Sequence, residues 1–173
     1  MNNGKLTDRT GRIETALENM ALRMVGRVCV LGIGNRERGD DGAGSLVAGG
    51  LRSGGAMAAI DAGMAPENHL EMVARTEPDT VVVVDAVDFG GAPGELRTLH
   101  GHEIGRGGLS THAPSLAMTM DYLVARTGAR LLLLGIQPAA LGSNRELSIE
   151  VSRTVDRVRD FLAQLQDIKR KNV

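Results

Sequence analysis

The chain has 173 residues, which fits one domain of ordinary size with a sizeable core. It is 42% hydrophobic and 24% charged, a composition typical of globular proteins that excludes a disordered chain. The formal net charge of -1, with a single Tyr, two Phe and no Trp, argues against nucleic-acid binding, which uses basic surfaces and aromatic rings that stack on bases.

The N-terminus lacks an apolar signal segment, and no apolar run approaches the ~18 residues that span a bilayer. We therefore expect a soluble cytoplasmic monomer without membrane insertion. The single cysteine, Cys29, excludes an internal disulfide and a four-thiolate zinc site. Cys29 lies within an apolar run, where a buried small hydrophobic side chain is its expected role.

Apolar runs bounded by turn residues predict strands, and apolar residues at helical spacing predict helices between them. The expected strands cover residues 27–33, 57–60, 80–84, 95–100 and 130–136. The expected helices cover residues 12–24, about 41–52, 69–76, 115–126 and 145–169. Asp40 is in position to cap the second of these helices through its side chain.

This alternation predicts an α/β fold with three layers, α/β/α, around a mostly parallel five-stranded sheet. One edge strand, residues 95–100, alternates polar and apolar residues and is expected to be antiparallel. Residues 1–26 are expected to be an N-terminal extension, loose at first and then helical. Residues 27–169 are expected to form a single α/β domain, and residues 170–173 a C-terminal tail.

The stretch VCVLGIGNRERGDDGAG, residues 28–44, ends a buried strand in a glycine-rich turn and two adjacent carboxylates, Asp40 and Asp41. Right-handed crossovers place the ends of the first and third strands at one edge of the sheet, where ligands of open α/β sheets bind. Asp85 closes the third strand. Asp41 and Asp85 are therefore expected to lie close together.

Two common chemistries fit this stretch poorly. The dinucleotide-binding pattern G-x-G-x-x-G fails, because Glu37 occupies the third glycine position and would face a pyrophosphate. Neither Ser45 nor Ser110 sits in a nucleophile elbow, and Cys29 lies inside a strand rather than beyond its end. Nucleophilic catalysis and nucleotide binding are therefore the weaker hypotheses.

The remaining candidates are hard or borderline metal ligands. Two carboxylates and an imidazole can bind a divalent transition metal while leaving coordination positions open. Without a cation, two close aspartates repel each other. Taken singly, each candidate also fits a helix cap, a strand end or a surface loop. The candidates are Asp40, Asp41, Asp61, Asp85, Asp88, His69, His100, His102 and His112.

Four ordered segments carry a resemblance to a known family. They read GIGNRERGDDGAG, VVVVDAVDFGGAPGEL, THAPSLAMTMDYL and LLLLGIQP, and IDAGMAPENHLE adds to them. In this order they resemble the [NiFe]-hydrogenase maturation endopeptidases, and most closely the branch that processes large subunits of hydrogenase-3-like enzymes. The resemblance runs from about residue 28 to residue 165. The extension before Val28 departs from it, because similar proteins often begin near the first strand.

The resemblance implies three site residues. The family's metal-contacting acid after the glycine–Asn turn falls on Asp41, where some members carry Glu. The second acid, at the end of the middle strand, falls on Asp85, and the histidine that opens the following helix falls on His112. His69, His100 and His102 match no family position and are expected to be surface residues.

The resemblance also implies the activity. Such an enzyme removes a short C-terminal peptide from the hydrogenase large-subunit precursor after nickel insertion, and residues 27–169 would be its protease domain. The nickel belongs to the precursor, so no permanent cofactor is expected. Because a histidine binds metal in its neutral form, activity is expected to fall at acid pH. A non-cleaving checkpoint or chaperone for the nickel-loaded precursor remains an alternative.

Overall fold

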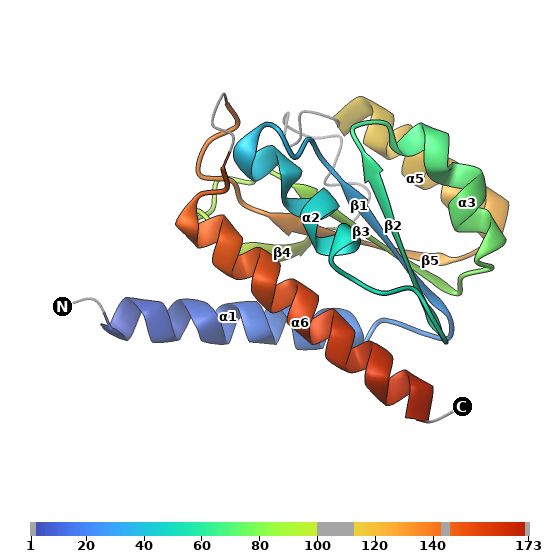
Figure 1. Cartoon of the computed structure of the whole chain (residues 1–173), viewed down its shortest axis with the longest axis horizontal. Helices are drawn as coiled ribbons and strands as arrows, with labels where there is room; N and C mark the ends of the chain where they lie inside the picture. Colours follow the sequence, from blue (N-terminus) through green and yellow to red (C-terminus); the bar gives the residue numbers. More distant parts are fainter. Residues whose placement is uncertain (1–2, 100–112, 143–145, 172–173) are drawn as a thin grey trace.

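The computed structural model describes residues 3–99, 113–142 and 146–171 (Figure 1). Within these residues, five strands form one sheet in the order β2-β1-β3-β5-β4. Strands β1, β2, β3 and β5 are parallel, and β4 pairs antiparallel with β5. The predicted α/β class and the antiparallel edge strand are confirmed. The strands are β1 (Val28–Ile33), β2 (Met57–Gly63), β3 (Thr80–Ala86), β4 (Leu96–Leu99) and β5 (Arg130–Ile136).

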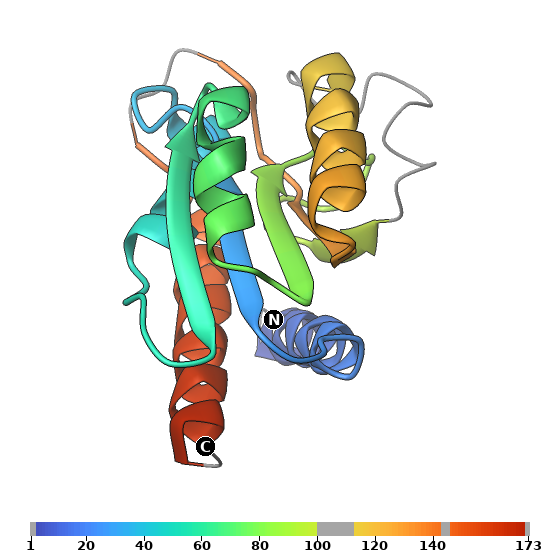
Figure 2. The ribbon, with the colours of Figure 1, turned by 90° about the vertical axis from the view of Figure 1, so that its right-hand side faces the viewer.

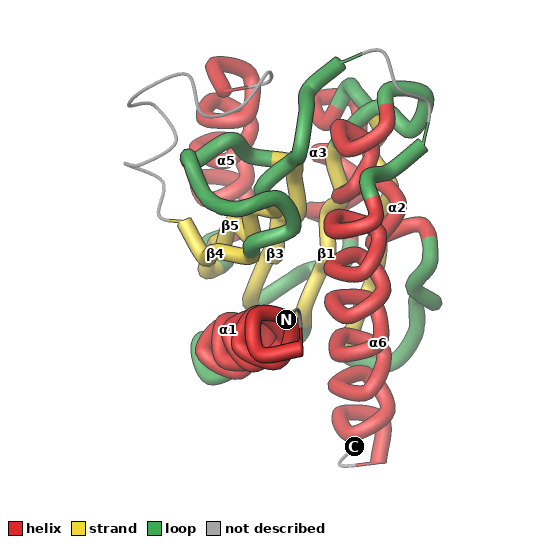
Figure 3. Tube along the Cα trace, turned by 90° about the vertical axis from the view of Figure 1, so that its left-hand side faces the viewer, coloured by secondary structure: helices red, strands yellow, loops and turns green. Residues whose placement is uncertain are grey.

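Helices cover both faces of the sheet. Figures 1 and 2 show α3 and α5 on one side of it, and Figure 3 shows α1 and α6 on the other. The short helix α2 packs against α6, on the same side as α1. The α-helices are α1 (Asn3–Ala21), α2 (Ala43–Gly49), α3 (Leu70–Arg75), α5 (Ala113–Thr127) and α6 (Ile149–Lys171); two 3-10 helices are η1 (Gly39–Gly42) and η2 (Pro66–His69).

Each face of the sheet supports its own hydrophobic cluster, because successive side chains of a strand point to opposite sides. In β3, Val82 and Val84 join the cluster under α1, α2 and α6, whereas Val81 and Val83 join the cluster under α3 and α5. All seven residues of β3 are buried. A strand covered on both faces explains the unbroken run of four valines.

Several predicted boundaries and faces were wrong. Helix α1 begins at Asn3 rather than residue 12, and β2 continues to Gly63 rather than ending at Ile60. Three side chains expected to face inward are exposed: Met72 is 55% exposed, Val124 46% and Ile149 62%. Val73 and Val151 take the buried positions next to Met72 and Ile149. Because only one side of each helix faces the sheet, a small error in the helix phase exchanges a buried for an exposed side chain.

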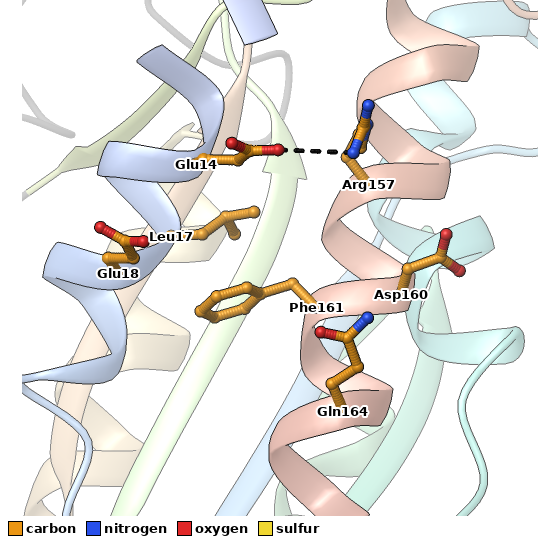
Figure 4. Close-up of a pocket in the computed structure, with 7 residues that line it drawn as sticks. All are labelled: Glu14, Leu17, Glu18, Arg157, Asp160, Phe161 and Gln164. Atoms are coloured by element: carbon orange, nitrogen blue, oxygen red, sulfur yellow. Dashed lines mark hydrogen bonds and ion pairs between the residues drawn. The ribbon is translucent and has the colours of Figure 1, made fainter. Parts of the chain in front are cut away.

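The N-terminal helix packs on the rest of the chain. Its apolar face carries Ile13, Leu17 and Met20, which are at most 6% exposed and belong to the cluster under α2 and α6. Where α1 crosses α6, a hollow of about 360 Å³ is lined by polar side chains together with Leu17 and Phe161 (Figure 4). Glu14 of α1 pairs there with Arg157 of α6 at 3.4 Å. The division of the chain at residue 26 stays a prediction.

Because Ile13 is buried, Ile13→Val should lower the free energy of unfolding by about 0.5–1.5 kcal/mol. Ile168 on α6 is 56% exposed and offers a matched control, so Ile168→Val should change it by less than about 0.5 kcal/mol. Urea unfolding of both variants tests this. Equal midpoints would contradict the packing of α1 on the sheet.

None of the helices in the described segments is both long enough and apolar enough to cross a lipid bilayer.

Candidate active site

The strand order reverses between β1 and β3, since the chain passes from β1 to β2 on one side and to β3 on the other. Loops that leave the carboxyl ends of these strands diverge there, which makes this the usual place for a ligand site. Helix η1, which carries Asp41, packs against β3, which carries Asp85. The two predicted acids therefore belong to neighbouring segments at the switch point.

The glycines at the end of β1, Gly32 and Gly34, make room for neighbouring backbone. A Cβ on Gly32 would lie 2.1 Å from the Gly44 carbonyl oxygen, and a Cβ on Gly34 would lie 1.8 Å from the Asp41 carbonyl oxygen. Gly34 also has a φ of +135°, which side chains rarely adopt. This G-x-G pair thus lets η1 and α2 fold back onto the end of β1, which explains it without a dinucleotide.

Asp41 and Asp85 are both buried, with exposed fractions of 5% and 0%. The backbone N–H of Asn35 donates to Asp41 Oδ2 at 3.3 Å, and the N–H of Ala86 donates to Asp85 Oδ1 at 2.9 Å. Asp85 lies inside β3 rather than just beyond it, opposite Gly135 of β5. Both carboxylates are thus shielded from water and accept a backbone N–H.

The neighbouring Asp40 has a different role. Its predicted capping of the next helix was wrong, because no side-chain cap bond forms at η1 or α2. Instead its carboxylate accepts the N–H of Ala139 at 2.8 Å, and the N–H and Oγ–H of Ser148 at 2.6 and 2.9 Å. Asp40 therefore ties the loop after β1 to the loop after β5 and the start of α6.

Asp61, another candidate ligand, is held by an arginine. Its Oδ2 accepts a 2.6 Å bond from Arg36 Nη2, and its Oδ1 accepts bonds from Ser45 Oγ at 2.6 Å and Gly63 N at 3.1 Å. The same Arg36 donates from Nε to Ser45 Oγ at 2.8 Å and from Nη2 to the Ser45 carbonyl at 2.9 Å. Both oxygens of Asp61 are thus engaged.

Asp88 is engaged by Gln137, the glutamine of the LLLLGIQP segment. Gln137 is 5% exposed; its Nε2 donates to Asp88 Oδ1 at 3.0 Å, and its Oε1 accepts the N–H groups of Phe89 and Gly91. The bond from Gln137, and then that from the N–H of Gly90, lowers the pKa of Asp88 below its ordinary value. Gln137 thereby shapes the loop that follows β3.

Gln137→Leu should raise the pKa of Asp88 toward its ordinary value, because the largest cause of the shift is lost. A lowered pKa stabilises the fold above the unfolded-state pKa, and this contribution disappears as the pH falls through the folded-state pKa. Carbon-13 NMR titration of the Asp88 carboxyl measures the change. Gln164→Leu, at an exposed position of α6, should leave the titration of Asp88 unaltered. An identical titration in the Gln137 variant would contradict the assignment.

Of the histidines, the structure describes only His69, and it places the single cysteine in the core. His69 is partly buried and contacts the Ala65 carbonyl through Nδ1 at 3.2 Å, a local contact across helix η2. His100, His102 and His112 lie outside the described residues. Cys29 is buried in β1, and burial raises the pKa of its thiol to about 11, so it stays protonated at neutral pH.

Among residues 3–99, 113–142 and 146–171, no three Asp, Glu, His or Cys side chains gather as a metal site requires. The predicted set needs His112, outside these ranges, so its convergence with Asp41 and Asp85 stays a prediction. The hollow between α1 and α6 contains none of the three. The switch point, rather than that hollow, is the candidate active site.

Comparison with known proteins decides the family. A family model described as hydrogenase maturation protease matches residues 50–164. Hydrogenase 3 maturation protease of Escherichia coli strain K12 is 33% identical over 132 residues, 75% of this chain and 84% of that relative. The chain belongs to the hydrogenase maturation protease family. The region matched by the family model includes Asp85 and His112 and begins after Asp41.

Solved structures of hydrogenase maturation proteases share the fold. The crystal structure of a [NiFe] hydrogenase maturation protease, HycI from Thermococcus kodakarensis KOD1, has a TM-score of 0.73 and 32% identity, covering 80% of this chain and 91% of that one. The solution structure of an endopeptidase HycI from Escherichia coli has a TM-score of 0.70 and 29% identity, covering 81% and 91%.

Three features of the carboxyl edge were not predicted from the sequence: the Arg36–Ser45 contact, the Asp40 bonds to Ser148 before α6, and the Gln137 bonds to the loop after β3. A polar residue directly after a buried strand, as in LLLLGIQP, is a usable signal for Gln137. The Arg36 and Asp40 partners lie 9 to 108 positions away along the chain, so no local pattern marks them.

Proposed function

We propose that this protease removes the C-terminal extension of a [NiFe]-hydrogenase large-subunit precursor after nickel insertion, and that it recognises the nickel held by the precursor. The observation that carries this is the pair of buried carboxylates, Asp41 and Asp85, on neighbouring segments at the strand-order switch of a hydrogenase maturation protease. The names of the similar proteins supply the hydrogenase as partner.

In this proposal Asp41, Asp85 and His112 complete the coordination of the precursor's nickel. Carboxylate oxygens and a neutral imidazole are suitable ligands for a divalent metal whose other positions are filled by cysteines. Asp40, Asp61 and Asp88 are assigned roles within the fold, because their carboxylates accept hydrogen bonds from Ser148, Arg36 and Gln137.

Coordination of the nickel by the protease would fix the position of the precursor chain that binds it, and hence of the peptide bond to be cut. Such positioning lowers a barrier by up to ~7–11 kcal/mol in ideal cases. The attacking water is activated either by the nickel or by one carboxylate acting as a base. Because Asp85 is fully covered and Asp41 almost so, both must gain access when the precursor docks.

The test is incubation of the purified protein with nickel-loaded and nickel-free precursor, followed by mass spectrometry of the products. We expect only the nickel-loaded precursor to lose its C-terminal peptide. Equal cleavage of both forms would remove the nickel requirement from the proposal. A precursor that binds but stays full-length would favour the checkpoint or chaperone role instead.

A further inference from the structure

Arg36 connects three segments at the carboxyl edge of the sheet and lies outside the predicted ligand set. Its guanidinium donates three hydrogen bonds of 2.6–2.9 Å, to the carboxylate of Asp61 and to the hydroxyl and carbonyl oxygens of Ser45. Ser45 is 1% exposed, whereas the side chains of Arg36 and Asp61 are 45% and 33% exposed. The arginine thus joins the loop after β1 to α2 and to the end of β2.

Two glycines, Gly42 and Gly49, leave space for the backbone and for the guanidinium of Arg36. A Cβ on Gly49 would lie 1.9 Å from Arg36 Nη2, and a Cβ on Gly42 would lie 2.7 Å from the Cα of Arg36. Any side chain at Gly49 would displace the guanidinium. The backbone and the side chain of Arg36 are therefore both confined by their neighbours.

The residue before Arg36 orients the first predicted ligand. The backbone N–H of Asn35 donates to the carboxylate of Asp41, and the Asp41 carbonyl packs against Gly34. Arg36 directly follows Asn35, and its side-chain hydrogen bonds to Ser45 and Asp61 hold this part of the loop in place. A shift of this loop moves the Asn35 N–H, and with it the carboxylate of Asp41.

We propose that Arg36, held by Ser45 and Asp61, is a positioning residue that sets the orientation of Asp41 for the reaction. This inference rests on the proposed function. It gives Asp61 the role of an acceptor for Arg36 rather than of a metal ligand, because both of its oxygens receive hydrogen bonds. Arg36 acts through the loop and touches neither nickel nor precursor.

The first experiment measures kcat and KM for nickel-loaded precursor with Arg36→Gln. We expect kcat to fall about 10–100-fold while KM stays within about twofold, since misplacement by about 1 Å can cost 100-fold. The control is Arg126→Gln on α5, which breaks a similarly exposed pair with Glu71 at 3.4 Å and should leave both constants unchanged. Circular dichroism at the assay temperature confirms that each variant is folded.

Two further comparisons, Arg36→Lys and the double variant of Arg36 and Asp61, distinguish a positioning role of Arg36 from direct contact with the precursor. Arg36→Lys should recover part of kcat. A lysine ammonium can still pair with Asp61, but it lacks the planar guanidinium that also donates hydrogen bonds to Ser45. Asp61→Asn should resemble Arg36→Gln, and the double variant should be no worse than either, because the two residues act as one unit.

Three results would overturn the inference while leaving the proposed function in place. The first is an unchanged kcat in folded Arg36→Gln. The second is a raised KM with normal kcat, which would show that Arg36 contacts the precursor itself. The third is multiplicative loss in the double variant, which would give Asp61 an independent role. The proposed function fails separately, if the wild-type protein leaves the nickel-loaded precursor uncut.

Discussion

Asp41→Asn is expected to reduce processing of nickel-loaded precursor by about 100-fold or more, a larger loss than the 10–100-fold typical of residues that only support a metal ligand. Asparagine has nearly the same shape as aspartate, and its amide oxygen can still accept the N–H of Asn35. It lacks the charge that binds a divalent cation, so the loss should appear without unfolding. Rates from mass spectrometry, with circular dichroism of the same samples, measure both quantities.

The informative comparison is Asp41→Glu, which keeps the carboxylate on a longer side chain. If Asp41 supplies a ligand, glutamate should restore part of the rate that asparagine removes, whereas a purely structural role as acceptor of the Asn35 N–H would let Asp41→Asn work. Normal trimming by Asp41→Asn would exclude Asp41 as a nickel ligand. Asp85→Asn should behave like Asp41→Asn, because the proposal gives both acids the same task.

The strands could be predicted because a strand that is buried on both faces has an unbroken run of apolar residues in the sequence. A run such as Val81–Val84 has no polar alternation, so it predicts a central strand of a parallel sheet. Once the order of strands and helices is known, the switch point follows, and with it the placement of Asp41 and Asp85. The fold class was therefore predictable, and so was the contact between η1 and β3, the segments that carry Asp41 and Asp85.

The start of the chain was misread for a different physical reason. Residues 3–11 are polar and carry no amphipathic pattern, which suggested a loose segment. In the structure they continue a helix whose later residues, Ile13, Leu17 and Met20, are packed on the sheet. Extending an existing helix costs far less than nucleating one, so packing further along allows polar residues to be helical.

The partners of the polar side chains were not predictable. Asp40 and Asp41 are adjacent carboxylates with nearly equal burial, yet Asp40 bonds to Ser148 and Ala139 while Asp41 bonds to the nearby Asn35 N–H. The difference arises from chain segments about 100 positions away, whose approach depends on the whole fold. The resemblance to a family, rather than spacing, selected Asp41 in advance.

The second large effect is on stability. Asp40→Ala is expected to lower the free energy of unfolding by about 2–4 kcal/mol, because it leaves the N–H groups of Ala139 and Ser148 without their charged acceptor. For a domain of this size the melting temperature should fall by roughly 5–15 °C. Asp156→Ala, which removes an exposed ion pair with Arg159, should cost less than about 1 kcal/mol.

Asp40→Asn should lower the free energy of unfolding by less than Asp40→Ala and by more than Asp156→Ala. The reason lies in which oxygen accepts which hydrogen bond. One oxygen of the carboxylate accepts the Ser148 N–H, and an asparagine oxygen can replace it. The other oxygen accepts the Ala139 N–H and the Ser148 hydroxyl, where an NH2 group would face an N–H donor. Thermal unfolding followed by circular dichroism ranks the three variants. If Asp40→Ala instead melts like the wild type and still fails to process precursor when folded, then Asp40 belongs to the reaction, and the division of labour between the two neighbouring aspartates is wrong.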